Sequence, residues 1–275
     1  MRGWRRIRVG MARHFKVLGS PINHSKSPAI HSAAYDFLGL DWDYDRSRVE
    51  AGQLSDFLLQ DASDGYSVTM PLKEEAYAIS TRRDELATLS GTVNTLVRLE
   101  GGLSGFNTDV FGLSKAISSF DFEEYQLLGT GATARNAVIA LAQNAPAATL
   151  TVTGRDKSKA QGIVDFAVQL GLKAQVADWV QGESGSLTIA TLPGSADASM
   201  LVSRAEGTLF DVAYSPWPSS LGKLWLQNGG NLVSGIDMLV WQAIAQIRIF
   251  LTGSVADPLE NEDALAKIML AVAEK

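Results

Sequence analysis

The chain of 275 residues is long enough for two compact units and short for three typical domains. Its apolar fraction of 46% and charged fraction of 20% are ordinary for a folded soluble protein, and they exclude a disordered or collagen-like chain. The formal net charge of -6 argues against nucleic acid or an anionic membrane surface as a partner.

The N-terminal part of the chain alternates strand patterns with helix patterns. Residues 1–13 are basic but lack the apolar core and cleavage site of a secretory signal, and we expect the ordered chain to start near Met11. Such alternation favours a mostly parallel sheet. The predicted elements are a strand at 15–19, a helix at 28–38, a strand at 41–49, a helix at 53–60, a strand at 65–70, two short strands around Gly101-Gly102 and a helix at 110–119.

The segment SVTMPLK, residues 67–73, combines the end of a predicted strand with a proline and a lysine. Proline cannot donate to a sheet ladder and fixes its own backbone, so we expect Pro71 to end the strand and turn the chain. The turn would hold Lys73 at the exit of the strand. There the lysine is either a surface side chain or a positioned proton donor.

The remaining chain repeats the alternation. The C-terminal stretch 236–251 is strongly apolar, but it carries polar side chains such as Asp237, Gln242 and Arg248, which predicts a buried helix and not a membrane span. The predicted elements are a strand, glycine turn and helix in 125–143, a strand and helix in 148–170, strands in 186–193, 207–214 and 231–235, and helices at 236–251 and about 259–273.

The stretch LLGTGATARNA follows an apolar run and precedes a helix, which is the setting of a dinucleotide-binding turn. In that motif Gly129 makes the tight turn, Gly131 lets the backbone approach a pyrophosphate, and the small Ala134 permits close helix packing. The N-terminus of the helix adds free N–H groups and the positive end of a dipole. The alternative is an ordinary strand-to-helix turn.

The loop TGRDKSK, after the next strand, lies where a dinucleotide site distinguishes NADP from NAD. Arg155, Lys157 and Lys159 offer positive charge to a 2′-phosphate, whereas Asp156 can accept a hydrogen bond from a ribose hydroxyl. For the two lysines, a solvated first helical turn is the alternative. The balance favours NADP.

Metal-ligating side chains are scarce. The chain has no cysteine, which excludes disulfides and thiolate metal sites and is compatible with a reducing cytoplasm. The three histidines, His14, His24 and His31, do not form a zincin-type pair, so we expect no metal centre.

Seven motifs together resemble the shikimate dehydrogenase family in order and approximate spacing, and the resemblance covers nearly the whole chain from residue 15. It implies reversible, NADP-dependent reduction of 3-dehydroshikimate to shikimate, a step in making the precursors of aromatic amino acids, with Lys73 and Asp109 as the catalytic pair. A lysine can give a proton to a developing alkoxide, and a carboxylate can orient it. The motifs are GSPINHSKSPAIH, SVTMPLK, GTVNT, GFNTDVFGL, GTGATARNA, FDVAYSPWPSSL and GIDMLVWQA.

The same resemblance implies a set of substrate-binding residues. They are Ser25 and Ser27 for the carboxylate, Thr69, Asn94, Asp109 and Gln242 for ring hydroxyls, and Tyr214. Several have a structural alternative: Ser27 can be a helix N-cap, Asn94 a turn residue and Tyr214 a core aromatic. Gln242, with Gln246 one turn later, forms either a polar stripe that faces a cleft or a structural hydrogen bond.

For the cofactor, the resemblance implies contacts from seven residues. These are Gly129, Gly131, Ala132, Arg155, Lys159, Thr191 and Met238, and core packing is the alternative for Met238. The chain departs from the family at three places near this set. Gly154-Arg155-Asp156 stands where Asn-Arg-Thr is common, Ile189 where asparagine often precedes Ala-Thr, and Asp237 where glycine is frequent.

We therefore expect an α/β protein of two domains. Residues 1–109, completed by the C-terminal helices 236–275, would form a mixed-sheet substrate domain, and 110–235 a Rossmann-like, doubly wound NAD(P)-binding domain. The reaction would take place in the cleft between them, in a cytoplasmic monomer or homodimer with small molecules as its partners. An NAD-linked quinate/shikimate dehydrogenase is one alternative, and a non-catalytic dinucleotide-sensing module is another.

Overall fold

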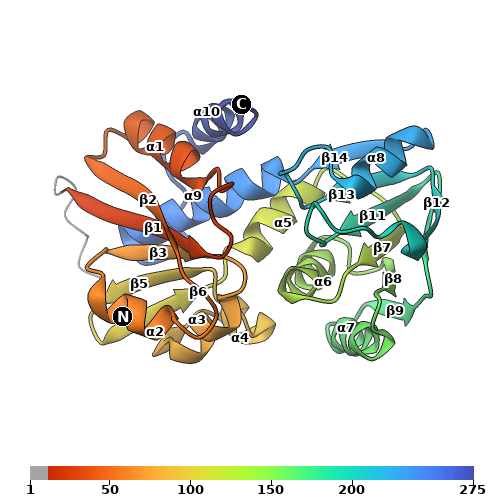
Figure 1. The fold of residues 1–275 in the computed structure, drawn as a ribbon, viewed down its shortest axis with the longest axis horizontal. Helices are drawn as coiled ribbons and strands as arrows, with labels where there is room; N and C mark the ends of the chain where they lie inside the picture. Colours follow the sequence, from red (N-terminus) through yellow and green to blue (C-terminus); the bar gives the residue numbers. More distant parts are fainter. Residues whose placement is uncertain (1–11) are drawn as a thin grey trace. The chain divides into compact units, whose positions relative to one another are not determined.

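The computed structural model describes residues 12–275, so the expectation for the basic N-terminal segment lies outside the described residues. The chain divides into two units, which are distinguished in Figure 1 by their separate sheets. The first comprises residues up to Gly112 together with Leu239–Lys275, and the second comprises Leu113–Met238. Both divisions fall inside helices, α5 (Asp109–Ile117) and α9 (Ile236–Thr252), within one helical turn of the expected boundaries.

The first unit is built on a mixed six-stranded sheet in the order β2-β1-β3-β5-β6-β4. Strand β1 pairs in parallel with β2 and β3, whereas β5 runs antiparallel to β3 and β6. The predicted mixed sheet is confirmed. Its strands are β1 (Arg13–Gly19), β2 (Trp42–Arg48), β3 (Gly65–Val68), β4 (Arg82–Arg83), β5 (Thr95–Leu99) and β6 (Gly102–Phe106).

Side chains of β1 alternate between two apolar layers. On one face Phe15 stacks on Phe250 of α9, with ring centroids 4.2 Å apart. On the other face Leu18 joins a buried cluster with Leu58 and Ala76. Helix α1 packs against α10, as Figure 1 shows. The further helices of this unit are α1 (Ser27–Leu38), α2 (Leu54–Gln60), α3 (Lys73–Ile79), α4 (Glu85–Ser90) and α10 (Glu262–Ala273).

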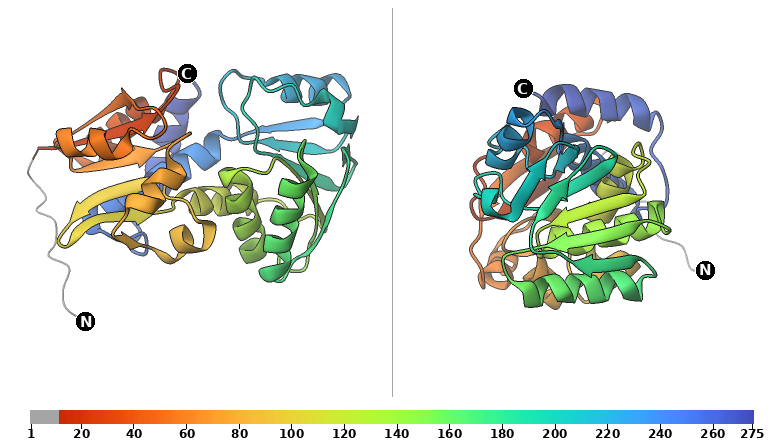
Figure 2. Two further views of the ribbon diagram at one scale, coloured as in Figure 1. Left: turned by 60° about the horizontal axis from the view of Figure 1, so that its bottom comes forward. Right: turned by 90° about the vertical axis from the view of Figure 1, so that its right-hand side faces the viewer.

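The second unit contains a parallel six-stranded sheet in the order β14-β13-β11-β7-β8-β9, which confirms the doubly wound prediction. The strand order reverses between β7 and β11, and doubly wound sheets bind ligands at such a switch point. Figure 2 shows these strands in green to blue. The elements are β7 (Glu124–Leu128), α6 (Ala132–Asn144), β8 (Thr149–Thr153), α7 (Lys157–Gln169), β9 (Lys173–Val176), β11 (Ser186–Ala190), β13 (Thr208–Asp211), α8 (Ser220–Gln227) and β14 (Asn231–Ser234), with a small sheet of β10 (Val180–Gly182) and β12 (Val202–Ala205) and a 3-10 turn at Ser199–Leu201.

The segment around Pro71 differs from the prediction. Strand β3 ends at Val68, and the backbone N–H of Leu72 then closes a turn onto the carbonyl of Thr69 at 2.9 Å. Pro71 lies inside this turn, so it helps to turn the chain but does not end the strand. Lys73 is the first residue of α3, a helix that the sequence pattern did not predict.

Several other short elements were not predicted. A segment of two to eight residues has too few positions for a hydrophobic period to be recognised. Its structure is decided by neighbours in space: the two residues of β4, for example, pair with Ser104 and Gly105 of β6. These elements are α4, α8, β4, β9, β10 and β12.

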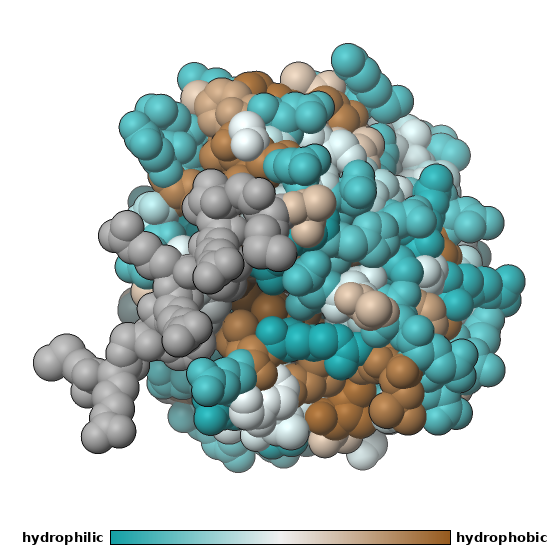
Figure 3. Space-filling model, turned by 90° about the vertical axis from the view of Figure 1, so that its left-hand side faces the viewer, coloured by the Kyte–Doolittle hydropathy of each residue, from teal (hydrophilic) through white to brown (hydrophobic). Residues whose placement is uncertain are grey.

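Helix α9 is buried continuously from Gln242 to Phe250, which confirms the prediction for this apolar stretch. No helix among residues 12–275 is long and apolar enough to cross a membrane. The face of the molecule in Figure 3 is mainly hydrophilic, with apolar side chains in separate groups. Among the described residues of the first unit, the most exposed large apolar side chain is Leu59, at 85%.

Candidate functional site

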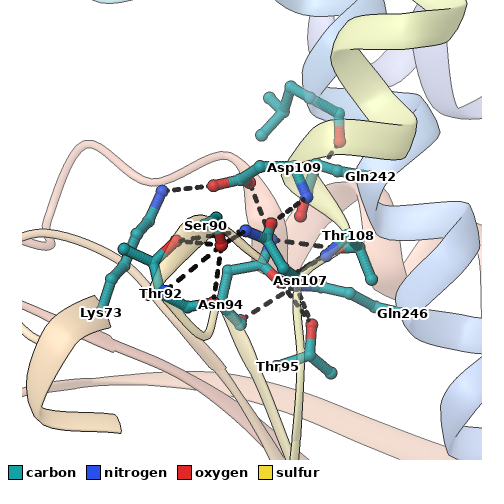
Figure 4. A network of polar contacts seen from close by, with 11 residues as sticks. Lys73, Ser90, Thr92, Asn94, Thr95, Asn107, Thr108, Asp109, Gln242 and Gln246 are labelled. Carbon is teal, nitrogen blue, oxygen red and sulfur yellow. Dashed lines mark hydrogen bonds and ion pairs between the residues drawn. The ribbon is translucent and has the colours of Figure 1, made fainter. Parts of the chain in front are cut away.

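Two helix starts of the first unit bring a lysine and an aspartate together. Lys73 is the first residue of α3, and Asp109 is the first residue of α5. The Nζ of Lys73 donates to Oδ2 of Asp109 at 2.5 Å, as Figure 4 shows. The two side chains are only 16% and 7% exposed, so this is a largely desolvated ion pair. The structure thus brings the two predicted catalytic residues into direct contact.

Asn94 holds the other oxygen of the carboxylate. Its Nδ2 donates to Oδ1 of Asp109 at 2.7 Å, and its Oδ1 accepts from the backbone N–H of Thr108 at 2.9 Å. The Asn94 backbone N–H bonds to the carbonyl of Phe106 on β6, which anchors it to the sheet. Asn94 is therefore a buried part of this polar cluster and not an exposed turn residue.

The two glutamines of α9 differ in their contacts. Gln242 donates from Nε2 to the carbonyl of Leu239, three residues earlier in its own helix, at 2.8 Å. Gln246 bonds to the sheet, because its Nε2 donates to Oγ1 of Thr95 at 3.1 Å and its Oε1 accepts from Oγ of Ser67 at 2.7 Å. Gln246 therefore makes structural hydrogen bonds to the sheet. The contact of Gln242 stays within its own helix.

The predicted carboxylate-binding serines lie at the start of α1. Ser27 is the first residue of the helix, and the N-cap is Lys26, which makes no side-chain capping hydrogen bond. The N-cap interpretation of Ser27 is therefore wrong. Oγ of Ser25 accepts from the backbone N–H of Ser27 at 3.3 Å, so the two serines are adjacent in space.

Thr69 is held close to the end of β1. Its backbone N–H donates to the carbonyl of Leu18 at 2.9 Å, and the N–H of Ser20 donates to the carbonyl of Met70 at 3.0 Å. A Cβ added at Gly19 would lie 2.4 Å from Cγ2 of Thr69. Only glycine permits this approach, which places Thr69 beside the loop that leads to α1.

In the second unit, Gly129 and Gly131 occupy the turn between β7 and α6. Gly129 has φ 126°, and a Cβ there would lie 2.2 Å from Oγ1 of Thr191, so glycine is required. The contact brings Gly129 and Thr191 together at the switch point of the sheet. Gly131 is the exposed N-cap of α6, directly before Ala132, and an added Cβ would meet nothing within 4 Å. Free space beside helical N–H groups fits a bound pyrophosphate.

The charged residues in and after the loop that follows β8 differ in their contacts. Asp156 is the N-cap of α7, and its Oδ1 accepts from the N–H groups of Ser158 and Lys159 at 2.9 and 3.1 Å. Both capping contacts are made by one of the two carboxylate oxygens. Lys157 pairs with Asp178 at 2.5 Å. Arg155 and Lys159 are both exposed in the same loop and first turn, which fits a 2′-phosphate.

Tyr214 and Met238 belong to the second unit. Tyr214 follows β13 and is partly exposed, and burial of its ring raises the pKa of the phenol above its usual value. The loop that carries it is held by Asp211, whose Oδ1 accepts from the N–H of Ala213 at 3.0 Å and whose Oδ2 accepts from Ser219. Asp211 could not be recognised from the sequence, because its polar partners follow it at irregular spacing. Met238 is partly exposed in the first turn of α9.

No group of three or more metal-ligating side chains is present among residues 12–275. The described fold and site consist of a doubly wound unit with a glycine turn at its switch point, and a mixed-sheet unit with a desolvated lysine–aspartate pair. Together they define a dinucleotide-dependent oxidoreductase that handles a small polar substrate.

Comparisons with known proteins give the family. The shikimate dehydrogenase substrate binding domain matches residues 17–96. The NADP(+) shikimate dehydrogenase of Nitrosopumilus maritimus is 32% identical over an alignment of 256 positions that covers 87% of this chain and 93% of that protein. Among solved structures, Mycobacterium tuberculosis shikimate dehydrogenase has a TM-score of 0.77 and 33% identity, over 94% of this chain and 98% of its own.

A further solved structure carries ligands. Shikimate 5-dehydrogenase from Thermus thermophilus, in complex with NADP(H) and shikimate, has a TM-score of 0.77 and 27% identity, over 95% of this chain and 98% of its own. The chain described here belongs to the shikimate dehydrogenase family.

Proposed function

We propose that this chain catalyses the reversible, NADP-dependent reduction of 3-dehydroshikimate to shikimate. The observation that carries the proposal is the 2.5 Å contact between Lys73 and Asp109 in a polar cluster that is largely removed from water. Curated NADP(+) shikimate dehydrogenases about as long as this chain support the same reaction. The reaction is a step in the synthesis of aromatic amino-acid precursors.

The ammonium of Lys73 is the proton donor in the reducing direction. Bound NADPH supplies the reducing equivalent to the ketone carbon, and the ketone oxygen then develops negative charge. Lys73 stabilises this charge and gives the oxygen a proton. Asp109 holds the ammonium in place and accepts a hydrogen bond from a substrate hydroxyl, while Asn94 fixes the carboxylate. In the oxidising direction the uncharged amine of Lys73 accepts the proton from the substrate hydroxyl.

The remaining candidate residues bind the two ligands. In the substrate unit we assign Ser25 and Ser27 to the carboxylate of shikimate, and Thr69 and Gln242 to its hydroxyls. Tyr214 of the other unit would add a further contact. For NADP we assign residues of the glycine turn, the β8–α7 loop with the first turn of α7, the segment after β11 and the first turn of α9. They are Gly129, Gly131, Ala132, Arg155, Lys159, Thr191 and Met238.

We infer a cytoplasmic enzyme with small-molecule partners, as a monomer or homodimer. The absence of cysteine and the net charge of -6 support this inference. An NAD-linked quinate/shikimate dehydrogenase depends on Asp156 as the ribose acceptor, whereas the exposed Arg155 and Lys159 in the same segment favour a 2′-phosphate. A non-catalytic sensor has no need of a desolvated proton-donor pair.

The experiment measures initial rates of the purified full chain with shikimate and with quinate, each with NADP and NAD. We expect shikimate with NADP to be the preferred combination. Lys73→Ala should lower kcat by at least about 100-fold with little change in shikimate affinity, because it removes the general acid and leaves most binding contacts. The matched control is Lys267→Ala, which removes an exposed lysine of α10. Near-normal turnover in Lys73→Ala would remove the catalytic assignment.

A further inference from the structure

A directed chain of hydrogen bonds crosses the interior of the first unit and ends on the Asp109 carboxylate. All of its members are less than 9% exposed. Figure 4 shows the part from Gln246 to Lys73. The chain runs from Tyr44 through Ser67, Gln246, Thr95 and Asn94 to Asp109, with distances of 2.5, 2.7, 3.1, 2.8 and 2.7 Å between successive polar atoms.

Backbone groups fix the direction of this chain. The N–H of Thr108 can only donate, so the Asn94 atom it meets at 2.9 Å is the amide oxygen, and Nδ2 must point to Asp109. The carbonyl of Asn94 can only accept, so the Gln246 atom facing it at 3.4 Å is Nε2. Neither amide can be reversed without the loss of a buried hydrogen bond.

Thr95 connects the two amides. Its hydroxyl has one hydrogen, which it donates to Oδ1 of Asn94 at 2.8 Å, and it accepts from Nε2 of Gln246 at 3.1 Å. Thr95 is 0% and Gln246 is 2% exposed, so neither side chain can touch a substrate in this structure. The hydrogen bonds that connect these residues to Asp109 pass through Asn94.

We propose that Thr95 and Gln246 are positioning residues for the reaction. They hold the amide of Asn94, and through it the Asp109 carboxylate, in the orientation that presents Oδ2 to Lys73. This inference rests on the proposed function, because it assumes that Lys73 and Asp109 carry the chemistry. Without the Thr95 hydroxyl, Thr108 alone holds Oδ1 of Asn94, and the carboxylate gains freedom to turn away from the ammonium.

The test removes the hydroxyl and keeps the shape of the side chain. Thr95→Val should lower kcat on the order of 10-fold, because small displacements of a catalytic group are costly. Thr95→Ser keeps the hydroxyl and should restore turnover to within about 3-fold of the parent chain. Thr188→Val is the matched control: it also removes a buried hydroxyl, but one without a hydrogen-bond partner, and should leave kcat unchanged.

A double-mutant cycle separates positioning from a merely structural role. In an Asp109→Asn background, Thr95→Val should cause no further loss of kcat, because its effect passes through the carboxylate. Calorimetry of shikimate binding without cofactor and thermal unfolding show that each variant is folded and binds. If Thr95→Val does not fold, Gln246→Met removes the Nε2 donor at similar volume, and the same cycle applies.

The outcomes distinguish the two proposals. If Lys73→Ala loses turnover but Thr95→Val and Gln246→Met keep it, the positioning inference is overturned and the proposed function stands. An equal loss from Thr95→Val in the parent and Asp109→Asn backgrounds also overturns the inference. If Lys73→Ala itself keeps turnover, the proposed catalytic pair fails, and the inference fails with it.

Discussion

His31 has the most strongly altered acid–base chemistry of the described histidines. It is 0% exposed, and its ring stacks on Tyr44 with centroids 3.9 Å apart. Burial lowers the pKa of the imidazole from 6.5 to about 3, and a smaller opposing effect comes from Gln246. His31 is therefore neutral at neutral pH, so the interior next to Gln246 carries no charge from this ring.

This shift predicts a loss of stability in acid. At about pH 5 the unfolded chain protonates His31 and the folded chain does not, so acid favours unfolding. Between about pH 7.5 and 5, the free energy of unfolding should fall by about 2 kcal/mol more in the parent chain than in His31→Phe, which keeps an aromatic ring. Urea unfolding at both pH values measures this. The exposed His24, as His24→Gln, should behave like the parent, whereas equal pH dependence in parent and His31→Phe would contradict the shift.

At the scale of elements, the end of β1 and the turn after β3 are packed too closely for any side chain at Gly19. A Cβ there would lie 2.4 Å from Cγ2 of Thr69 and 2.8 Å from the carbonyl oxygen of Met70. The backbone atom cannot rotate away as the tip of a long side chain could. The position of the turn before α3 therefore depends on one glycine.

Gly19→Ala should lower the free energy of unfolding by about 1–3 kcal/mol, the usual cost of forced overpacking. It should also weaken shikimate binding, because it displaces Thr69. Chemical denaturation and calorimetry measure the two effects. If the variant is as stable as the parent, the close approach of these elements is contradicted.

A matched control is available in α7. At Gly162 an added Cβ meets nothing within 4 Å, and the residue is exposed inside the helix. Gly162→Ala should raise the free energy of unfolding by about 0.5–1 kcal/mol, because alanine loses less backbone entropy in a helix. The same chemical change should thus have opposite signs at the two glycines.

At the scale of the whole molecule, we expect the first unit to bind most of the substrate and the second unit to bind the cofactor. We expect shikimate to slow hydrogen exchange mainly around β5, β6 and the start of α5, and NADP to slow it around the β7–α6 turn and residues 154–159. Mass spectrometry of the full chain measures both. Protection of the β7–α6 turn and of residues 154–159 by shikimate alone would contradict this expectation.

A substitution at Gly131 tests whether the glycine turn binds the cofactor. An added side chain meets open space there, so Gly131→Val should fold. The valine would occupy the space assigned to the pyrophosphate, and NADP affinity should fall at least about 10-fold, which corresponds to about 1.4 kcal/mol. Shikimate protection should stay as in the parent chain. Unchanged NADP binding would argue against the glycine turn as the cofactor site.

The sequence allowed the order of most long elements, the two sheet types and the glycine turn to be predicted, because these depend on local periodicity and spacing. The pairing of Lys73 with Asp109 came from the family resemblance. The contacts of Gln246 with Ser67 and Thr95 could not be predicted, since they join residues far apart in the chain. The capping role of Asp156 was missed because the same residue type also suits a ribose hydroxyl.

Lys73 and Asp109 each occupy the first position of a helix, so the two residues proposed for the reaction also affect the stability of two helix ends. The positive end of α5 favours the negative charge of Asp109 by about 0.3–1 kcal/mol, whereas the positive end of α3 disfavours an ammonium. The acidic Glu74 and Glu75 in the first turn of α3 offset part of that repulsion. The Asp109 carboxylate therefore has two roles, since an uncharged substitute would loosen two helix ends as well as slow turnover.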